Sequence, residues 1–216
     1  MRRTLLTLAL LAAGTAQAAT VSVYTSLAAW QAAIASPAQT QDFTGYPIGT
    51  DLTGMAVLPG VTLSSNLGPV EVFSADTEAV AFGPARQAGN AYYEAQYALP
   101  FRAVALDITA FESIPGDGST AVDSGLLRFL FSDGSSTDLS VFGGSGANIF
   151  IGIVSDVAVT SFRWNEAHEA NGLNEETGLD NLRVALRGNG NTVPLPGTLP
   201  LVALALGVLP LVRRRG

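Results

Sequence analysis

Acidic side chains are the residues of this chain whose type and spacing could support catalysis or metal binding. Three groups stand out along the central segment, and the largest also holds the single histidine of the chain. The groups are Glu166, His168, Glu169, Glu175, Glu176 and Asp180; Asp117 and Asp123; and Asp133 and Asp138. Asp133 precedes Gly134, a pair typical of hairpin turns, so we interpret Asp133 as a turn residue. For Asp117 and Asp123 we expect a solvated loop.

Hydrolysis is the first chemistry to consider. A glycosidase needs two opposed carboxylates with different pKa values, and Glu166 with Glu175 or Glu176 is the pair that this sequence offers. A Ser-His-Asp triad would depend on His168, and the glycine-rich stretch 143–147 lacks the Gly-x-Ser-x-Gly spacing of a nucleophile elbow. The chain has no cysteine, which excludes thiol nucleophiles and cysteine-ligated zinc. We therefore expect a non-catalytic protein and keep a secreted, glycosidase-like hydrolase as the alternative.

Asp180 is the acidic residue with the least ordinary setting. It lies beside Asn181 in an otherwise apolar strand, between Leu179 and Leu182. A carboxylate that faces inward there needs a partner, and calcium is a cation that takes carboxylate and carbonyl oxygens. The alternative is that Asp180 faces solvent or caps a turn.

The charge of the central segment limits its partners. The termini hold five of the 11 basic residues, whereas all 18 acidic residues and the other six arginines lie between them, which gives this segment a formal charge of −12. Such a surface repels nucleic-acid phosphates and anionic lipid headgroups. Nucleic acid is therefore not an expected partner.

A mostly β fold must position these residues. Residues 21–24 alternate as a strand, and Thr25 or Ser26 can cap a helix over 27–35, whose apolar stripe includes Trp30 as a core residue. Further β-prone runs follow at 57–64, 70–73, 91–97, 101–111 and 179–186. Two pairs of runs, 126–131 with 137–142 and 149–154 with 157–164, predict hairpins because Asp-containing turns separate their members. Many short strands with one early helix predict an antiparallel β-sandwich.

Three tyrosines in one predicted strand bear on glycan binding, since sugar rings stack on aromatic faces. They are Tyr92, Tyr93 and Tyr97. Successive side chains of a strand point to opposite faces, so Tyr93 and Tyr97 can share a two-ring platform while Tyr92 points the other way. The alternative, which we favour, is that these tyrosines belong to the core.

The N-terminus has the features of a secretory signal peptide. Met1-Arg2-Arg3 precedes an apolar run and then small residues in an A-x-A pattern, with Ala16 and Ala18 before Ala19. We expect signal peptidase to cleave between Ala18 and Ala19. The chain then divides into a signal peptide at 1–18, one β-sandwich domain at 19–187, a polar linker at 188–192 and a C-terminal tail at 193–216.

The tail has three parts in a defined order. Pro194-Leu195-Pro196 is followed by an uncharged apolar segment, which predicts a transmembrane helix, and then by Arg213, Arg214 and Arg215. This layout resembles the PEP-CTERM sorting tail of Gram-negative bacteria, as a variant with Leu195 in place of the family's usual Glu. The resemblance implies export through the inner membrane and a membrane-anchored precursor. It also implies processing by an exosortase and a final location at the cell surface or outside the cell.

The central domain also resembles a jelly-roll module that is common in PEP-CTERM proteins. The resemblance rests on 150–156, 159–164 and 178–182, and on the opening helix with Asp42-Phe43 before Gly49-Thr50. Similar sandwiches bind carbohydrate, so extracellular polysaccharide is the partner that it implies. In such modules an Asp at the position of Asp180 ligates a structural calcium ion near the first strand, and Asp42 is the matching N-terminal residue. The resemblance thus implies calcium at Asp42 and Asp180, and we expect no other cofactor.

Overall fold

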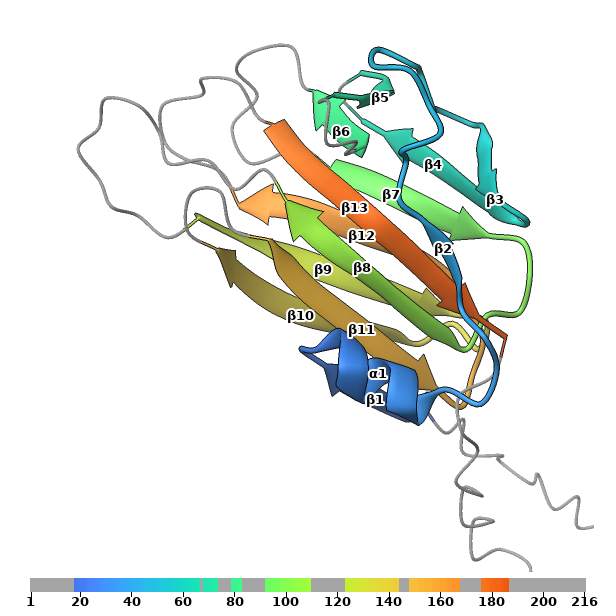
Figure 1. Cartoon of the computed structure of the whole chain (residues 1–216). Coiled ribbons are helices and arrows are strands. Elements are labelled where there is room, and N and C mark those ends of the chain that lie inside the picture. Colours follow the sequence, from blue (N-terminus) through green and yellow to red (C-terminus); the bar gives the residue numbers. More distant parts are fainter. Residues whose placement is uncertain are drawn as a thin grey trace, which may run out of the picture.

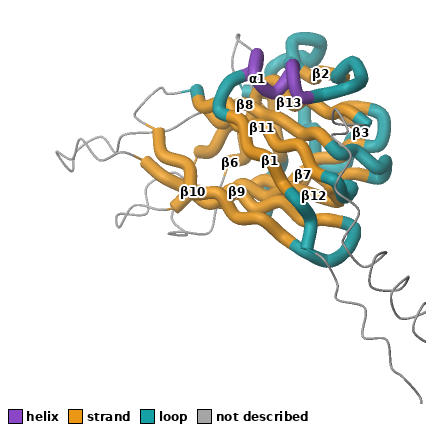
Figure 2. Tube along the Cα trace, turned by 90° about the horizontal axis from the view of Figure 1, so that it is seen from below, coloured by secondary structure: helices purple, strands orange, loops and turns teal. Residues whose placement is uncertain are grey.

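The chain folds as two β-sheets that pack face to face (Figure 1, Figure 2). The computed structural model describes residues 18–66, 68–73, 79–82, 92–109, 123–143, 148–167 and 176–186. Within them, every pair of neighbouring strands is antiparallel. This confirms the predicted antiparallel β-sandwich. The predicted signal helix and transmembrane helix lie outside the described residues.

The described strands divide into a sheet of seven and a sheet of six. The seven-stranded sheet has the order β1 (Val21–Tyr24), β11 (Ile149–Ser155), β8 (Ala103–Thr109), β13 (Glu176–Ala185), β6 (Ala79–Phe82) and β5 (Val70–Val72), with β2 (Gln39–Gln41) also paired to β13. The six-stranded sheet has the order β10 (Ser136–Gly143), β9 (Asp123–Phe131), β12 (Val159–Ala167), β7 (Tyr92–Tyr97), β4 (Val61–Ser65) and β3 (Ala56–Leu58). The predicted run 57–64 is thus two strands, because the chain turns at Gly60, where φ is +74°.

The main core lies between the two sheets. Alternate residues of each strand point into it, as expected for a sandwich with one solvated face on its six-stranded sheet. Its largest fully buried side chains are Phe43, Leu52, Leu63, Tyr93, Phe101, Leu106, Ile108, Phe129, Phe162 and Trp164. Trp164 packs over Gly125, where a Cβ atom would lie 2.2 Å from the indole ring.

A second apolar cluster covers the outer face of the seven-stranded sheet. There α1 (Leu27–Ala33) lies across the sheet, with Trp30 fully buried against Ala103, Ala105 and Ala185 (Figure 2). The Trp30 indole Nε1 donates a hydrogen bond of 3.0 Å to the backbone oxygen of Ile153. The predicted core role of Trp30 is confirmed. Cover on both faces also explains why all seven residues of β8 are buried.

The helix itself is close to the prediction. Ser26 is its N-cap, with Oγ accepting a hydrogen bond of 3.3 Å from the Ala29 backbone N–H. It ends at Ala33, two residues before the predicted end, because Ile34 has an extended backbone with φ of −96° and ψ of 143°.

One predicted hairpin is confirmed and the other is wrong. The β9–β10 hairpin turns at Asp133-Gly134, where Gly134 has φ of +84° and the Asp133 carboxylate accepts from the Ser135 N–H at 2.9 Å and hydroxyl at 2.6 Å. β11 and β12, in contrast, belong to different sheets. Asp156 draws the connection between them toward the N-terminal segment, since its carboxylate accepts from the Thr20 N–H at 2.8 Å. The chain therefore crosses the sandwich where the sequence predicts a hairpin turn.

Candidate binding face on the six-stranded sheet

The outer face of the six-stranded sheet presents mostly polar side chains in rows that run across the strands, with exposed apolar residues such as Leu130 among them. β7 shows why: Tyr93, Ala95 and Tyr97 are buried in the core, so Glu94 and Gln96 point outward. Residues that face each other in neighbouring antiparallel strands share a face of the sheet. One row consists of Ser64, Glu94, Arg163, Arg128 and Asp138, and a second consists of Thr62, Gln96, Ser161, Leu130 and Ser136. We call this surface the open face.

Glu94 is the centre of a fixed network on the open face. Its Oε2 accepts hydrogen bonds from Arg163 Nε at 2.9 Å and Nη2 at 2.5 Å, and its Oε1 accepts one from Gln96 Nε2 at 3.1 Å. The Glu94 side chain is only 12% exposed, whereas that of Arg163 is 41% exposed. The Arg163 guanidinium also lies over the Tyr92 ring, 4.1 Å from its centroid. The arginine, the amide and the aromatic ring are therefore held in place before any ligand binds.

A second ion pair lies on the same row near the sheet edge. Arg128 donates to both carboxylate oxygens of Asp138, from Nε and from Nη2, each at 2.7 Å. This bidentate contact lowers the pKa of Asp138 and raises the pKa of Arg128. Arg128 and Arg163 face each other across β9 and β12. Like charges in that position repel, and the carboxylates on the two flanking strands offset the repulsion.

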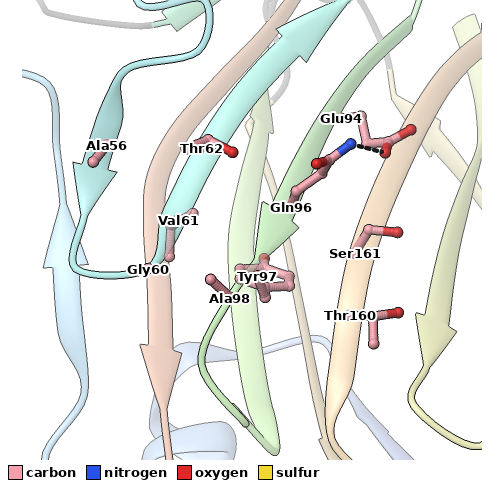
Figure 3. Close-up of a pocket in the computed structure, with 10 residues that line it drawn as sticks. All are labelled: Ala56, Gly60, Val61, Thr62, Glu94, Gln96, Tyr97, Ala98, Thr160 and Ser161. Carbon is pink, nitrogen blue, oxygen red and sulfur yellow. Dashed lines mark hydrogen bonds between the residues drawn. The ribbon is translucent and has the colours of Figure 1, made fainter.

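A shallow hollow of about 350 Å³ adjoins the Glu94 network (Figure 3). Its polar lining consists of Thr62, Glu94, Gln96, Thr160 and Ser161, and its apolar lining comes from β3, the β3–β4 turn and the end of β7. The Glu94–Gln96 hydrogen bond lies at its edge (Figure 3). Hydroxyl and amide groups of this kind both donate and accept hydrogen bonds, which suits a polar, uncharged ligand.

The tyrosines divide between core and surface as strand alternation requires. Tyr93 and Tyr97 are 0% and 8% exposed and contact Phe162 inside the sandwich, so the predicted core role is confirmed and they form no surface platform. Tyr92 is the tyrosine of the three that lies on the open face. Glu94 and Gln96 are not among the residues predicted from the sequence. The signal that could have indicated them is the alternation in 92–97, where polar residues fall between residues that are buried.

The structure describes only some of the acidic residues that were predicted as candidate sites. Glu166 and Glu176 belong to β12 and β13, which lie in different sheets. His168, Glu169, Glu175 and Asp117 lie outside the described residues, and Asp123 begins β9. Asp133 is a turn residue, as predicted, and the hydroxyl and N–H of Ser135 lower the pKa of its carboxyl group.

Asp42 and Asp180 come from adjoining segments, because Asp42 follows β2 and β2 pairs with 182–184 of β13. The Asp42 carboxylate accepts from the Thr44 N–H at 3.1 Å and hydroxyl at 2.8 Å, which lowers its pKa. The Asp180 oxygens accept from the N–H and side-chain amide of Asn181, each at 2.6 Å. Carboxylate oxygens are a ligand type that calcium prefers, but calcium takes roughly six to eight oxygen ligands, more than two carboxylates supply. No cluster of three or more metal-binding side chains occurs in the described part of the chain. Calcium at Asp42 and Asp180 stays a prediction.

The predicted export signals fall on parts that the structure does not describe. Ala16 and the tail, with Pro194, Leu195, Pro196 and the three terminal arginines, lie outside the described residues. In the described ranges, no helix is long and apolar enough to cross a membrane.

Comparison with known proteins shows a likeness to solved structures in fold and none in sequence. No family model matches this sequence, and no curated protein matches it. Among solved structures, the chain is similar to a mutant of CBM29-2, a family 29 carbohydrate binding module, with a TM-score of 0.41 and 8% sequence identity. The match covers 70% of this chain and 94% of that chain.

Proposed function

We propose that this chain is an exported, non-catalytic protein that binds a glycan through the open face of its six-stranded sheet. The observation that supports binding is the network in which Glu94 holds Arg163 and Gln96 beside a polar hollow. Sugars carry hydroxyl groups that donate and accept hydrogen bonds. A guanidinium group can donate to them, and amide and hydroxyl side chains can both donate and accept. Side chains that are already fixed lose less conformational entropy on binding, so this network favours recognition.

The same face also carries an aromatic side chain beside the network. Tyr92 projects from β7 and is kept in one orientation by the Arg163 guanidinium above its ring. An aromatic ring that is fixed in this way offers apolar contact at a low entropic cost. The proposed site therefore extends from the hollow, past Gln96 and Glu94, to Tyr92.

A binding comparison between two glutamine variants tests the proposal. The full mature chain is applied to a panel of immobilised polysaccharides, together with Gln96→Ala from the open face and Gln31→Ala from α1. Both glutamines are exposed, but α1 covers the opposite sheet. Gln96→Ala should weaken binding by about twofold to tenfold, the equivalent of roughly 0.5–1.4 kcal/mol for a lost hydrogen bond. If Gln96→Ala and Gln31→Ala bind the polysaccharide with equal affinity, the proposed site is wrong.

We also propose that the chain is exported and sorted, with Ala19 as the first residue of the mature protein. The A-x-A pattern at 16–18 and the order of Pro194-Leu195-Pro196, apolar segment and terminal arginines support this. Signal peptidase, exosortase and the inner membrane are then the partners of the precursor. N-terminal sequencing of exported protein should give Ala19. A strain without exosortase should keep the protein in its membrane fraction, while the parent strain releases or transfers it. Retention of Met1, or identical fractionation of the two strains, contradicts the respective part.

A further inference from the structure

The charges of the open face differ from those of the domain that carries it. The segment between the termini has a formal charge of −12. On the open face, the charged side chains among the described residues are Glu94, Arg163, Arg128 and Asp138, whose formal charges cancel. Two of the domain's six arginines are thus placed side by side on this one face, and each is paired with its own carboxylate.

This balance decides which class of glycan the face can take. An acidic polysaccharide would approach a strongly acidic domain, and the two guanidinium groups that could attract it are already paired, through Nε and Nη2, with Glu94 and Asp138. Its carboxylates would have to displace protein carboxylates from bidentate or near-bidentate contacts, for no net gain in charge pairing. A neutral polysaccharide meets neither obstacle, because its hydroxyl groups can use the remaining donors and acceptors of the row.

The geometry of the row sets the shape of the ligand. From Ser64 in β4 to Asp138 in β10 the row crosses five neighbouring strands. Four steps of about 4.8 Å make a strip roughly 19 Å long. Within the described residues, α1 is the helix present and it lies on the other sheet, so this strip carries no helical cover. A strip of this length fits a chain of sugar units better than a single sugar.

We infer that the ligand of the open face is a neutral polysaccharide chain that lies across the strands, from the hollow at Thr62 and Gln96 toward Arg128 and Asp138. This inference rests on the proposed function and specifies its ligand. Recognition by neutral hydrogen-bonding groups also has a consequence for salt: the affinity should change little with ionic strength, since no counterions are released on binding.

The test uses the full mature chain with defined probes. The neutral probes are dextran, xyloglucan and galactomannan, and the acidic probes are alginate and polygalacturonate. Each is measured at about 0.01 M and about 1 M salt, where the screening length is roughly 30 Å and 3 Å. We expect at least one neutral probe to bind with a Kd that changes less than about threefold between the two salt concentrations. We expect the acidic probes not to bind at either concentration.

A charge-switch variant makes the test sharper. Glu94→Gln keeps the size of the side chain but leaves Arg163 without its carboxylate, so the formal charge of the open face becomes positive. The variant should lower the affinity for the neutral probe by about tenfold, because Arg163 and Gln96 lose the carboxylate that fixes them. It should not make the acidic probes bind, because the central segment keeps a formal charge of −12 + 1 = −11. Gln31→Ala on α1 serves as the control, and an unchanged melting temperature shows that each variant is folded.

The outcomes separate the inference from the proposed function. Acidic probes that bind the unaltered chain, with an affinity that falls at high salt and is reduced by Gln96→Ala, overturn the neutral ligand but keep the glycan-binding face. If Glu94→Gln leaves the affinity for the neutral probe unchanged, the Glu94 network does not take part in binding and this inference is wrong. Binding to none of the probes, or binding that Gln96→Ala and Gln31→Ala affect equally, overturns the proposed function and the inference together.

Discussion

Two buried tyrosines on one strand differ in the hydrogen bonding of their hydroxyl groups, and that difference predicts opposite effects of the same substitution. Tyr93 and Tyr97 both point from β7 into the core and both contact Phe162. The Tyr93 hydroxyl donates a hydrogen bond of 2.9 Å to the backbone oxygen of Gly178 in β13, which links the two sheets. The Tyr97 hydroxyl is buried and has no hydrogen-bond partner among the described residues.

Replacement of either tyrosine by phenylalanine removes one oxygen and leaves the ring. In Tyr93→Phe the buried Gly178 oxygen loses the link to the other sheet, and we expect the free energy of unfolding to fall by about 1–3 kcal/mol. In Tyr97→Phe no hydrogen bond is lost and a buried, unbonded hydroxyl disappears. Because such a hydroxyl costs about 1–3 kcal/mol to bury, we expect this variant to be more stable than the parent by about 1 kcal/mol.

Urea and thermal unfolding of the two variants measure the difference. A change of 1 kcal/mol shifts the melting temperature of a domain of this size by about 2–4 °C, so the two variants should move in opposite directions. Burial also raises the pKa of Tyr97 well above its usual value. The unfolded chain therefore releases this proton more readily, and stability is lost as the pH rises above 10. Tyr97→Phe should flatten that alkaline loss. If Tyr97→Phe destabilises as much as Tyr93→Phe, the hydroxyl of Tyr97 is bonded in solution and the reasoning is wrong.

Three further predictions test the outer helix, the metal and the response to acid. Gly152→Ala should lower the free energy of unfolding by about 1–3 kcal/mol, because the added Cβ would lie 2.5 Å from Trp30 Cδ1. Gly45→Ala, where an added Cβ has nothing within 4 Å, is the matched control. Equal melting temperatures of the two variants would contradict the packing argument. If Asp42 and Asp180 hold calcium, the melting temperature should fall when a chelator is added, and Asp180→Ala should remove that response; no chelator effect on the unaltered chain excludes a structural site. Stability should also fall as the pH drops below about 4, since the pKa values of Asp42, Asp51, Asp133 and Asp138 are lowered in the folded state and the unfolded chain then binds more protons. Asp133→Asn should make this loss less steep in an acid titration followed by circular dichroism, and an unchanged slope would contradict the role of the Ser135 contacts.

Local signals in the sequence predicted local structure well. The cap at Ser26 and the turn at Asp133-Gly134 depend on a few neighbouring residues, and both are present. The crossing between β11 and β12 was missed because a short connection can have the same composition whether its two strands pair or belong to different sheets. The contacts of this connection are with residues far away in the chain, as in the hydrogen bond that the Asp156 carboxylate accepts from Thr20. Local sequence contains no signal for that contact.

The open face was missed for a related reason. Glu94 and Arg163 are 69 residues apart. The Arg128–Asp138 pair is local to the β9–β10 hairpin, and it joins the row of Glu94 and Arg163 only because β9 also pairs with β12. Alternation in 92–97 predicts which side chains point outward, but not which strands lie beside them. A row of paired charges is a property of strand order and register, and it becomes visible only when both are known. Aromatic residues are easier to single out in a sequence, which is why Tyr93 and Tyr97 were considered as a platform.

The two ends of the described domain lie at the same end of the sandwich. Thr20 O accepts from Asp156 N at 3.3 Å, while Ser155 N donates to Arg102 O at 2.8 Å and Arg102 N donates to Ala185 O at 3.1 Å. This chain of contacts joins the start of β1 to the end of β13, and both termini of the described domain leave from that side (Figure 1). If the tail anchors the precursor as predicted, the membrane tether joins the domain at this end of the sandwich and not on its open face. The tether and a ligand on the open face then use different sides of the domain.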